Sequence, residues 1–380
     1  MPFCSSVCPY CDFAVLIAGD ERRARWADSV VREAGMYAHG GLVFDTVYLG
    51  GGTPSCVSPE RLGEVLDGLR GHLGIVAGAQ VFLEANPEDV SRSAVDAWKS
   101  LGVHTVSLGV QSFDEATLAY LGRRHTADEA RAAADTLLAA DFHTVSVDLI
   151  YSFDGQSPAS WRSQIEEATA LGVQHFSCYQ LTIHHRTVFG RRLERGLVRE
   201  LPAEAQAELF FMTHEVLADA GFEGYEASSF AVAPEHRSYH NRKYWNHTPY
   251  LGLGPSAHSF AGGRRWWNRP KLRLWRSALD AGRSPVEGEE WPNEEQLLLE
   301  AVMLGLRTTD GLDLGALQQR FGFDLLQANA GLIDRLCASG HLEIGGGFLW
   351  PTLSGIAVAD ALAASFDLDP GGEGVRKLGS

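Results

Sequence analysis

Short apolar runs alternate with helical patterns from residue 20 to about residue 200, and this alternation constrains the fold more than any other feature of the chain. The runs predicted to form strands are 44–49, 81–85, 104–110, 144–150 and 174–181. The stretches predicted to form helices are 20–38, 59–73, 91–101, 126–141 and 158–171. Strands and helices that alternate at this spacing usually build parallel sheets through right-handed crossovers. We therefore expect an α/β fold, either a doubly wound sheet or a full or partial (β/α) barrel.

The rest of the chain has a different pattern. Residues 201–290 are less regular and rich in aromatic side chains. Helical patterns then return, and a hairpin around Gly345-Gly346-Gly347 follows them, which predicts a winged-helix-like C-terminal domain. The predicted division is 1–200 for the partial barrel, 201–290 for an extension, 291–366 for the C-terminal helical domain and 367–380 for a disordered tail.

Composition excludes several classes of protein. The net charge of −16 argues against nucleic-acid binding, which needs a basic footprint, and we discount DNA binding by the C-terminal domain for the same reason. No apolar run approaches the roughly 20 residues of a transmembrane helix. Six cysteines without a signal-peptide pattern fit a reducing compartment, so the expected location is the cytoplasm.

Three cysteines, Cys4, Cys8 and Cys11, stand within eight residues at the start of the chain. Thiolates at this spacing can ligate three irons of a [4Fe–4S] cluster and leave the fourth iron open to a small molecule. The alternatives are zinc with a distant histidine, or a disulfide with a spare thiol. We favour the cluster because the other cysteines are scattered singly, at positions Cys56, Cys178 and Cys337.

Polar residues follow the predicted strands. A glycine-rich turn, Gly50–Pro54, comes after the first, while Glu84, Gln111 and Asp148 close later ones. Ligands of parallel α/β folds gather at the carboxyl ends of the strands, so these side chains are expected at one mouth. Arg123 could clamp a ligand carboxylate there. Taken singly, each is equally well a capping or loop residue.

Together these motifs resemble a known family. The cysteine loop, Gly50–Pro54, Glu84, GVQSF at 109–113, Leu121–Thr126 and VDLIY at 147–151 are similar to those of radical S-adenosylmethionine (SAM) enzymes. The likeness is to the oxygen-independent coproporphyrinogen III oxidase branch, and within it to the HemW heme chaperone subfamily. It spans residues 4–365 and implies a partial (β/α) radical-SAM barrel with a C-terminal domain.

The resemblance implies specific cofactors and site residues. The three N-terminal cysteines would hold a [4Fe–4S] cluster, and SAM would chelate its open iron. An electron donor such as flavodoxin or ferredoxin would be needed if SAM is cleaved to a 5′-deoxyadenosyl radical. The positions that match SAM-contacting residues of the family are Tyr10, Gly51, Gly52, Thr53, Glu84, Gln111, Arg123 and Asp148.

Three features favour the chaperone within this branch. Asp12-Phe13 follows the third cysteine, where the decarboxylase pattern continues with glycine and another cysteine, and the decarboxylase's N-terminal extension is missing. Residues His240–Trp245 match the HNxxYW motif of the chaperones. The resemblance implies heme or porphyrin binding, with His240 as the candidate iron ligand, and transfer of heme to an acceptor protein.

Other functions stay open at this point. His240 could be a hydrogen-bonded structural histidine, with His184, His185 and His258 as the other candidate iron ligands. The chain could instead decarboxylate coproporphyrinogen III, act as another radical SAM enzyme such as a methyltransferase, or bind SAM without any tetrapyrrole. Whether it is an enzyme is therefore undecided by sequence.

Three departures from the family pattern stand out. The chain begins at Met1-Pro2-Phe3, so the first barrel strand is expected to be absent and a sheet edge to be unpaired. The loop 152–156 reads SFDGQ, an unusual sequence. Residues 184–187 read HHRT in place of Glu-Pro-Gly-Thr, which we interpret as an exposed basic turn; the alternative is a changed ligand. Arginine pairs such as Arg191-Arg192 are expected to be solvated surface.

Overall fold

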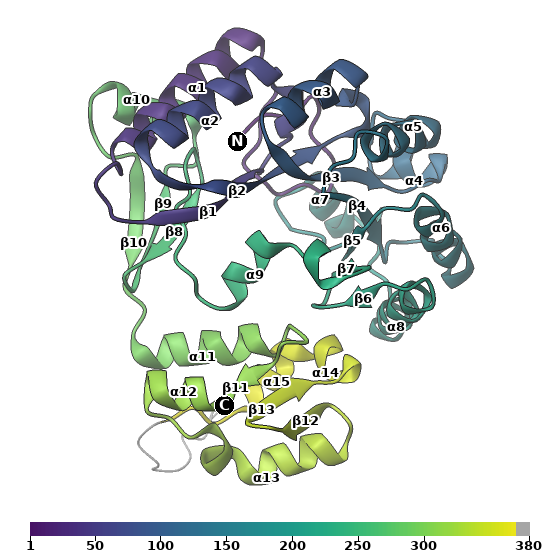
Figure 1. Cartoon of the computed structure of the whole chain (residues 1–380). Coiled ribbons are helices and arrows are strands. Elements are labelled where there is room, and N and C mark those ends of the chain that lie inside the picture. The colour runs from purple at the N-terminus through teal and green to yellow at the C-terminus, as the bar shows by residue number, and fades with distance from the viewer. Residues whose placement is uncertain (370–380) are drawn as a thin grey trace.

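The computed structural model describes residues 1–369; the predicted disordered tail lies, from residue 370 on, outside the described residues. Two large hydrophobic cores organise the described chain. One draws on residues between 3 and 279, and the other on residues between 298 and 368. Figure 1 shows the smaller C-terminal part below the larger one, beginning with helix α11 (Glu294–Gly305).

The larger part is built on one seven-stranded sheet. Its strands, in spatial order, are β1 (Val43–Leu49), β2 (Gly74–Ala85), β3 (Val103–Gln111), β4 (Thr144–Tyr151), β5 (His175–Gln180), β7 (Ser229–Ala231) and β6 (Glu223–Gly224). Strands β1 to β5 pair in parallel, whereas β7 pairs antiparallel with β5 and β6 antiparallel with β7. The five predicted strands are confirmed, and β1 forms one edge of the sheet.

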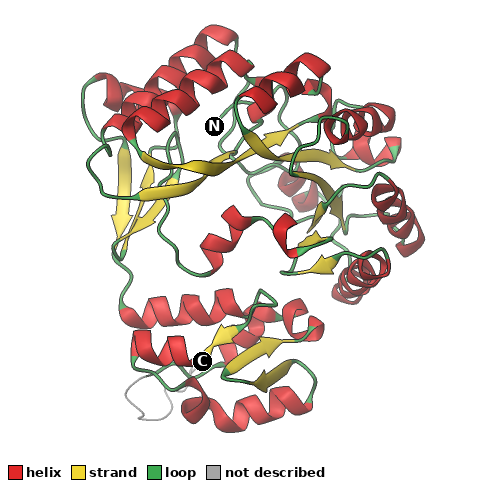
Figure 2. Ribbon diagram, in the orientation of Figure 1, coloured by secondary structure: helices red, strands yellow, loops and turns green. Residues whose placement is uncertain are grey.

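Helices cover the outer face of the curved sheet, which confirms the partial α/β barrel (Figure 2). The five predicted helices are α1 (Asp20–Gly35), α2 (Pro59–His72), α3 (Arg92–Ser100), α5 (Ala127–Leu138) and α6 (Pro158–Ala170). Local sequence sets where several begin. The Ser91 and Ser157 side chains cap α3 and α6, and Thr126 with Glu129 forms a capping box at α5.

Residues 201–290 were expected to be less regular than the barrel, but their first part is a regular helix. A 17-residue helix, α8 (Ala203–Asp219), occupies it and packs against α6. The aromatic residues that suggested irregular structure include Phe210, which is buried. Shorter helices α4 (Glu115–Tyr120) and α7 (Val188–Glu194) follow β3 and β5.

The extension after the sheet closes the open side of the barrel. Helix α9 (Tyr239–Trp245) lies there, against β1 (Figure 1). Beyond it come a three-stranded antiparallel sheet and a helix that packs on α1, with bounds β8 (His258–Ala261), β9 (Arg264–Asn268), β10 (Val286–Glu290) and α10 (Leu272–Asp280).

One buried carboxyl ties this extension to the barrel. Glu33 of α1 is fully buried, and its oxygens accept hydrogen bonds from Gly254 N at 2.7 Å, Asn268 Nδ2 at 2.5 Å and Trp275 Nε1 at 3.1 Å. Burial raises the pKa of Glu33 to about 7, although its three donors act in the opposite direction. Three segments of the extension therefore converge on a single side chain of the first helix.

The C-terminal part has the predicted helix–helix–hairpin order. Its elements after α11 are β11 (Leu312–Asp313), α12 (Leu314–Phe321), α13 (Leu325–Ala338), β12 (Leu342–Gly345), β13 (Phe348–Pro351), α14 (Leu353–Ala357) and α15 (Ala359–Ser365). The three strands form an antiparallel sheet with β13 in the middle. Within residues 1–369, no helix combines the length and apolar character needed to cross a bilayer.

Candidate functional site

The cysteine loop is seated on the glycine-rich turn that follows β1. Gly52 N donates to Met1 O and Thr53 N to Phe3 O, both at 2.7 Å. A Cβ on Gly52 would lie 2.4 Å from the Phe3 carbonyl oxygen, so only glycine permits this approach. Gly51 has φ +107°, and its N–H donates to the Glu84 carboxylate at 3.0 Å. The glycines predicted to meet SAM therefore also hold the first residues of the chain.

The three thiols fit a cluster better than the alternatives. Cys4, Cys8 and Cys11 are all free and half-buried, so no disulfide forms among them. In the described part of the chain, no three His, Cys, Asp or Glu side chains are grouped closely enough to hold a single metal ion. Three soft sulfur donors on one loop suit the separate irons of a [4Fe–4S] cluster.

A short hydrogen-bonded chain connects the thiols with the strand ends. Thr53 Oγ1 donates to Cys4 Sγ at 3.4 Å, and Arg123 Nη1 to Cys8 Sγ at 3.5 Å. Asn86 joins the two: its Nδ2 donates to Thr53 Oγ1 at 3.3 Å, and its Oδ1 accepts from Arg123 Nη2 at 2.7 Å. The Arg123 Nε is buried without a partner and remains available to a ligand.

Sequence analysis missed Asn86 as a site residue. Asn86 stands two positions after Glu84, in the turn that ends the strand. A polar residue so close to a predicted site residue could have indicated its role. The predicted Gln111 is half-buried at the end of β3 with φ +67°. A Cβ on Gly109 would lie 3.0 Å from Gln111 Nε2, so the glutamine folds back beside Gly109, whose carbonyl accepts from Arg123.

The two predicted carboxylates face one pocket. Glu84 Oε1 accepts from Tyr48 Oη at 2.8 Å, and Asp148 Oδ1 accepts from Ser107 Oγ at 2.8 Å. The protein packed around them raises the pKa of Glu84 to about 7 and that of Asp148 to about 6, and for Glu84 the nearby Asp148 charge adds to this. Tyr48 and Ser107 were not predicted, because nothing local marks a strand residue as facing the barrel interior.

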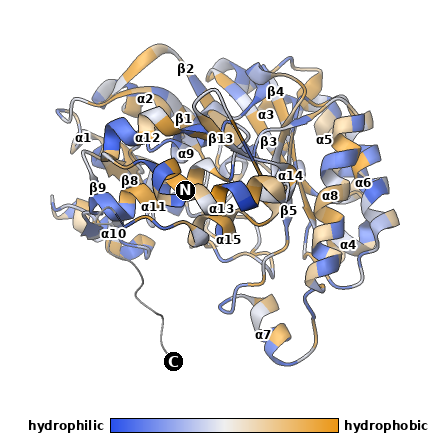
Figure 3. Cartoon of the chain, turned by 90° about the horizontal axis from the view of Figure 1, so that it is seen from below, coloured by the Kyte–Doolittle hydropathy of each residue, from blue (hydrophilic) through white to orange (hydrophobic). Residues whose placement is uncertain are grey.

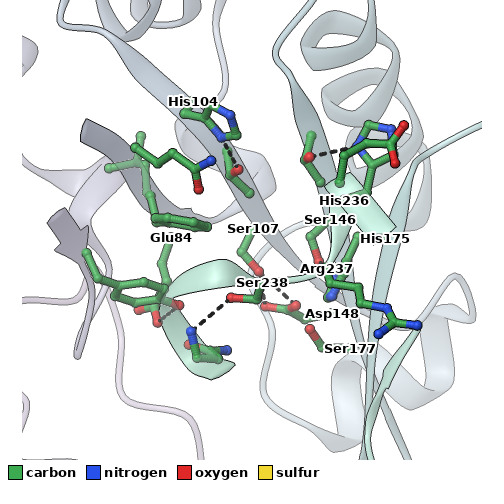
Figure 4. Close-up of a pocket in the computed structure, with 18 of the residues that line it drawn as sticks. Glu84, His104, Ser107, Ser146, Asp148, His175, Ser177, His236, Arg237 and Ser238 are labelled. Atoms are coloured by element: carbon green, nitrogen blue, oxygen red, sulfur yellow. Dashed lines mark hydrogen bonds between the residues drawn. The ribbon is translucent and has the colours of Figure 1, made fainter. Parts of the chain in front are cut away.

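This pocket is the barrel interior, and its cavity has a volume of about 70 Å³ (Figure 4). Hydroxyl and imidazole groups line it around Asp148, including Ser146, Ser177 and His175. Burial lowers the pKa of His175 to about 3 and that of His104, another lining residue, to about 4, so both imidazoles are neutral. The interior is thus polar, with its negative charge near the mouth.

Tyr10, predicted to contact SAM, lies inside the cysteine loop and packs on α7. Its ring centroid is 6.5 Å from that of Phe189, and the Phe189 N–H donates to Pro9 O at 2.9 Å. The first three residues of the HHRT segment, 184–186, are exposed beside this contact, with His184 Nε2 at 3.5 Å from Asp12 Oδ2, whereas Thr187 is buried and caps α7. The turn therefore borders the cysteine loop.

His240 lies apart from the thiols, on α9 at the edge strand β1. Its Nδ1 is 2.8 Å from Thr46 Oγ1, its Nε2 is 3.0 Å from Tyr244 Oη, and its ring stacks on Tyr48 at 5.0 Å. Burial and the positive Lys243 lower the pKa of His240 to about 4, so the ring is neutral. An iron atom could be bound at Nε2 if Tyr244 released it.

The strand-end residues predict the effect of mutations on SAM affinity. Glu84→Ala, Gln111→Ala and Asp148→Ala should each weaken SAM binding and leave the iron content unchanged, because none of these side chains is a metal ligand. Loss of one charged hydrogen bond costs about 1.5–3 kcal/mol, roughly ten- to a hundredfold in affinity. Anaerobic calorimetric titration of SAM measures the change. The control is Glu166→Ala, a change at an exposed residue of α6. Unchanged affinity in all three variants would refute the predicted SAM contacts at the strand ends.

Comparison with protein families identifies both parts of the chain. Residues 1–168 match the model of the radical SAM superfamily, and residues 293–358 match that of the HemN C-terminal domain. The solved structure of coproporphyrinogen III oxidase (HemN) from Escherichia coli, a radical SAM enzyme, superposes with a TM-score of 0.83 over 96% of this chain and 88% of that one. At 18% identity this similarity establishes a shared fold.

Curated relatives carry one name across distant bacteria. A protein of Synechocystis named heme chaperone HemW is 36% identical over 323 residues, which cover 82% of this chain and 77% of that protein. A protein of the same name from Mycobacterium tuberculosis is 33% identical over 367 residues, 95% of this chain and 92% of that protein. The similarity therefore extends across both parts of the fold.

Proposed function

Because this chain belongs to the HemW family of radical SAM proteins, we propose that it is a heme chaperone, which binds heme and transfers it to an acceptor protein. The [4Fe–4S] cluster and SAM are the cofactors that this superfamily implies. The proposed setting is the cytoplasm, where a reducing milieu keeps six free cysteines as thiols.

The charge of the barrel interior is the observation that carries the choice of chaperone over decarboxylase. Coproporphyrinogen III carries several propionate groups, and a site for it needs several cations. Arg237 is the one arginine among the residues that line the interior pocket, which includes no lysine. It is already paired with Glu223 at 2.9 Å and with Asp310 at 3.8 Å. Glu84, Asp148 and Glu235 line the same pocket, so it offers no unpaired lysine or arginine to a substrate that carries several propionates.

The site residues have separate roles in this proposal. The three cysteines hold the cluster, which together with SAM supplies redox chemistry when both are bound. Glu84 and Gln111 contact SAM, Asp148 orients it from the neighbouring strand, and Thr53, Asn86 and Arg123 position the thiols. Ser238 and Asn241, at the start of helix α9, line the barrel interior. The candidate heme ligand His240 is on the same helix and contacts Thr46 and Tyr48 of β1.

Heme titration tests the proposed function. The purified protein should bind about one heme per chain, and His240→Ala should shift the Soret maximum and weaken binding on the order of tenfold, because imidazole is a common axial ligand of heme iron. His39→Ala, an exposed histidine, is the matched control. A silent His240→Ala variant would reject this residue as the ligand, and His184, His185 and His258 are then tested in turn.

Product analysis separates the chaperone from the decarboxylase. Incubation with coproporphyrinogen III, SAM and a chemical reductant should leave the porphyrinogen unchanged. Formation of protoporphyrinogen IX with consumption of SAM would overturn the proposal and assign the oxidase activity. Absence of any Soret band in the titration would reject heme binding altogether.

A further inference from the structure

Five exposed arginines follow β5 in a chain of strongly negative net charge. We call them the arginine patch: Arg186, Arg191, Arg192, Arg195 and Arg199. Within residues 184–200 two acidic side chains, Glu194 and Glu200, accompany them, so this segment carries a local charge of +3 (five minus two) against −16 for the whole chain.

No carboxylate within residues 1–369 forms an ion pair with any of the five patch arginines. Their contacts are with neutral groups: Arg192 lies over the Phe189 ring at 5.7 Å, and Arg191 Nη1 donates to Arg186 O at 3.3 Å. By contrast, Arg131 and Arg265 each contact two carboxylates. Uncompensated cations on an acidic protein create a positive surface potential that can attract an anionic partner.

The patch adjoins the cysteine loop. Helix α7 contacts the cysteine loop through a hydrogen bond from Phe189 N to Pro9 O at 2.9 Å. Just before this helix, His184 Nε2 lies 3.5 Å from Asp12 Oδ2. The exposed Arg124 also contacts this loop, because its Nη1 donates to Ser5 O at 3.4 Å. Figure 3 shows α7 projecting from the body of the protein. Cationic side chains thus flank the loop that carries the thiols.

Exposed apolar side chains also occur in both segments. Val7 of the cysteine loop is 52% exposed, and Leu197 within the arginine segment is 68% exposed. Apolar groups surrounded by charge of one sign are typical of surfaces that bind a protein of opposite charge, where the charges steer the encounter and the apolar groups are desolvated on contact.

We propose that the arginine patch is the docking surface for an acidic electron-carrier protein. An electron carrier must bring its own redox centre close to the cluster site, and this surface surrounds the loop that forms that site. The lack of internal ion pairs leaves the arginines free to pair with carboxylates of the partner. The inference concerns reduction of the cluster site and is independent of heme binding, so the heme titration is unaffected if it fails.

Charge reversal tests the docking surface. The probe is a flavodoxin of negative net charge, titrated anaerobically by calorimetry against the cluster-loaded protein. Arg191→Glu with Arg195→Glu should weaken binding tenfold or more, and the affinity of the unmodified protein should fall steeply with added salt. The matched control is Arg273→Glu with Arg283→Glu, two exposed arginines without ion pairs on and just after α10, and it should change affinity less than twofold.

Further variants and a vesicle-binding measurement separate protein docking from misfolding and from membrane binding. Arg186→Gln with Arg199→Gln removes charge without reversing it and should weaken binding in the same direction but less. Iron content and circular dichroism must match the unmodified protein in every variant. Equal losses in patch and control variants would overturn the proposal. So would flavodoxin that does not bind while vesicles of phosphatidylserine and phosphatidylcholine do, since the patch would then contact membranes.

Discussion

Replacing any one of Cys4, Cys8 or Cys11 by alanine is expected to abolish the [4Fe–4S] cluster, from about four irons per chain to none. In the proposed site each thiolate ligates a different iron, and we expect that a cubane with only two protein ligands is not retained. Thr53 and Arg123 already direct hydrogen bonds at Cys4 and Cys8, which supports the arrangement of the thiols but cannot replace a ligand. Iron and sulfide analysis after anaerobic reconstitution measures the loss.

The other cysteines provide the matched control. Their replacement by alanine should leave the iron content unchanged, and SAM should still alter the electron paramagnetic resonance spectrum of the reduced cluster; they are Cys56, Cys178 and Cys337. A triple variant of the N-terminal cysteines that retains four irons would contradict the assignment of the ligands.

Replacing Glu33 by alanine is expected to lower the free energy of unfolding by about 3–5 kcal/mol. The change removes the acceptor of buried donors on Gly254, Asn268 and Trp275, and Asn268 Nδ2 keeps only its bond to Gly254 O. These donors belong to the extension, so its contact with α1 should weaken first. Urea unfolding followed by circular dichroism measures the loss. Glu21→Ala, an exposed residue on the same helix, should stay within about 0.5 kcal/mol of the unmodified protein.

The pH dependence of stability tests the buried state of Glu33. In the folded protein its pKa is raised to about 7, whereas the unfolded chain releases the proton near 4.5. Between pH 4.5 and about pH 7 the folded state therefore binds more protons than the unfolded chain. The contribution of Glu33 to stability is fully present below pH 4.5 and is lost as the pH rises through about 7. Glu33→Gln cannot ionise, so its stability should decline less between about pH 5 and about pH 8 than that of the unmodified protein. An identical decline would show that Glu33 ionises freely in the fold.

Local pattern explains why much of the site could be found without coordinates. Glu84, Gln111 and Asp148 each close a strand, and parallel strands bring their carboxyl ends to one edge of a sheet. The cysteine spacing is contained within eight residues, so its chemistry needs no tertiary information. Asn86 escaped notice because its role is to bridge Thr53 and Arg123, which lie on different loops.

The sequence alone determined the α/β class, the order of the barrel strands and helices, the cysteine loop and the family resemblance, because each depends on residues close together in the chain. Tertiary structure decided which distant groups meet. Only the fold brings His240 to Thr46, 194 residues away, and Glu33 to Trp275, 242 residues away. It also places the arginines after β5 beside the cysteine loop, which their sequence separation conceals. Such contacts depend on how strands pair and helices pack, and no local pattern of hydrophobicity or spacing encodes that pairing.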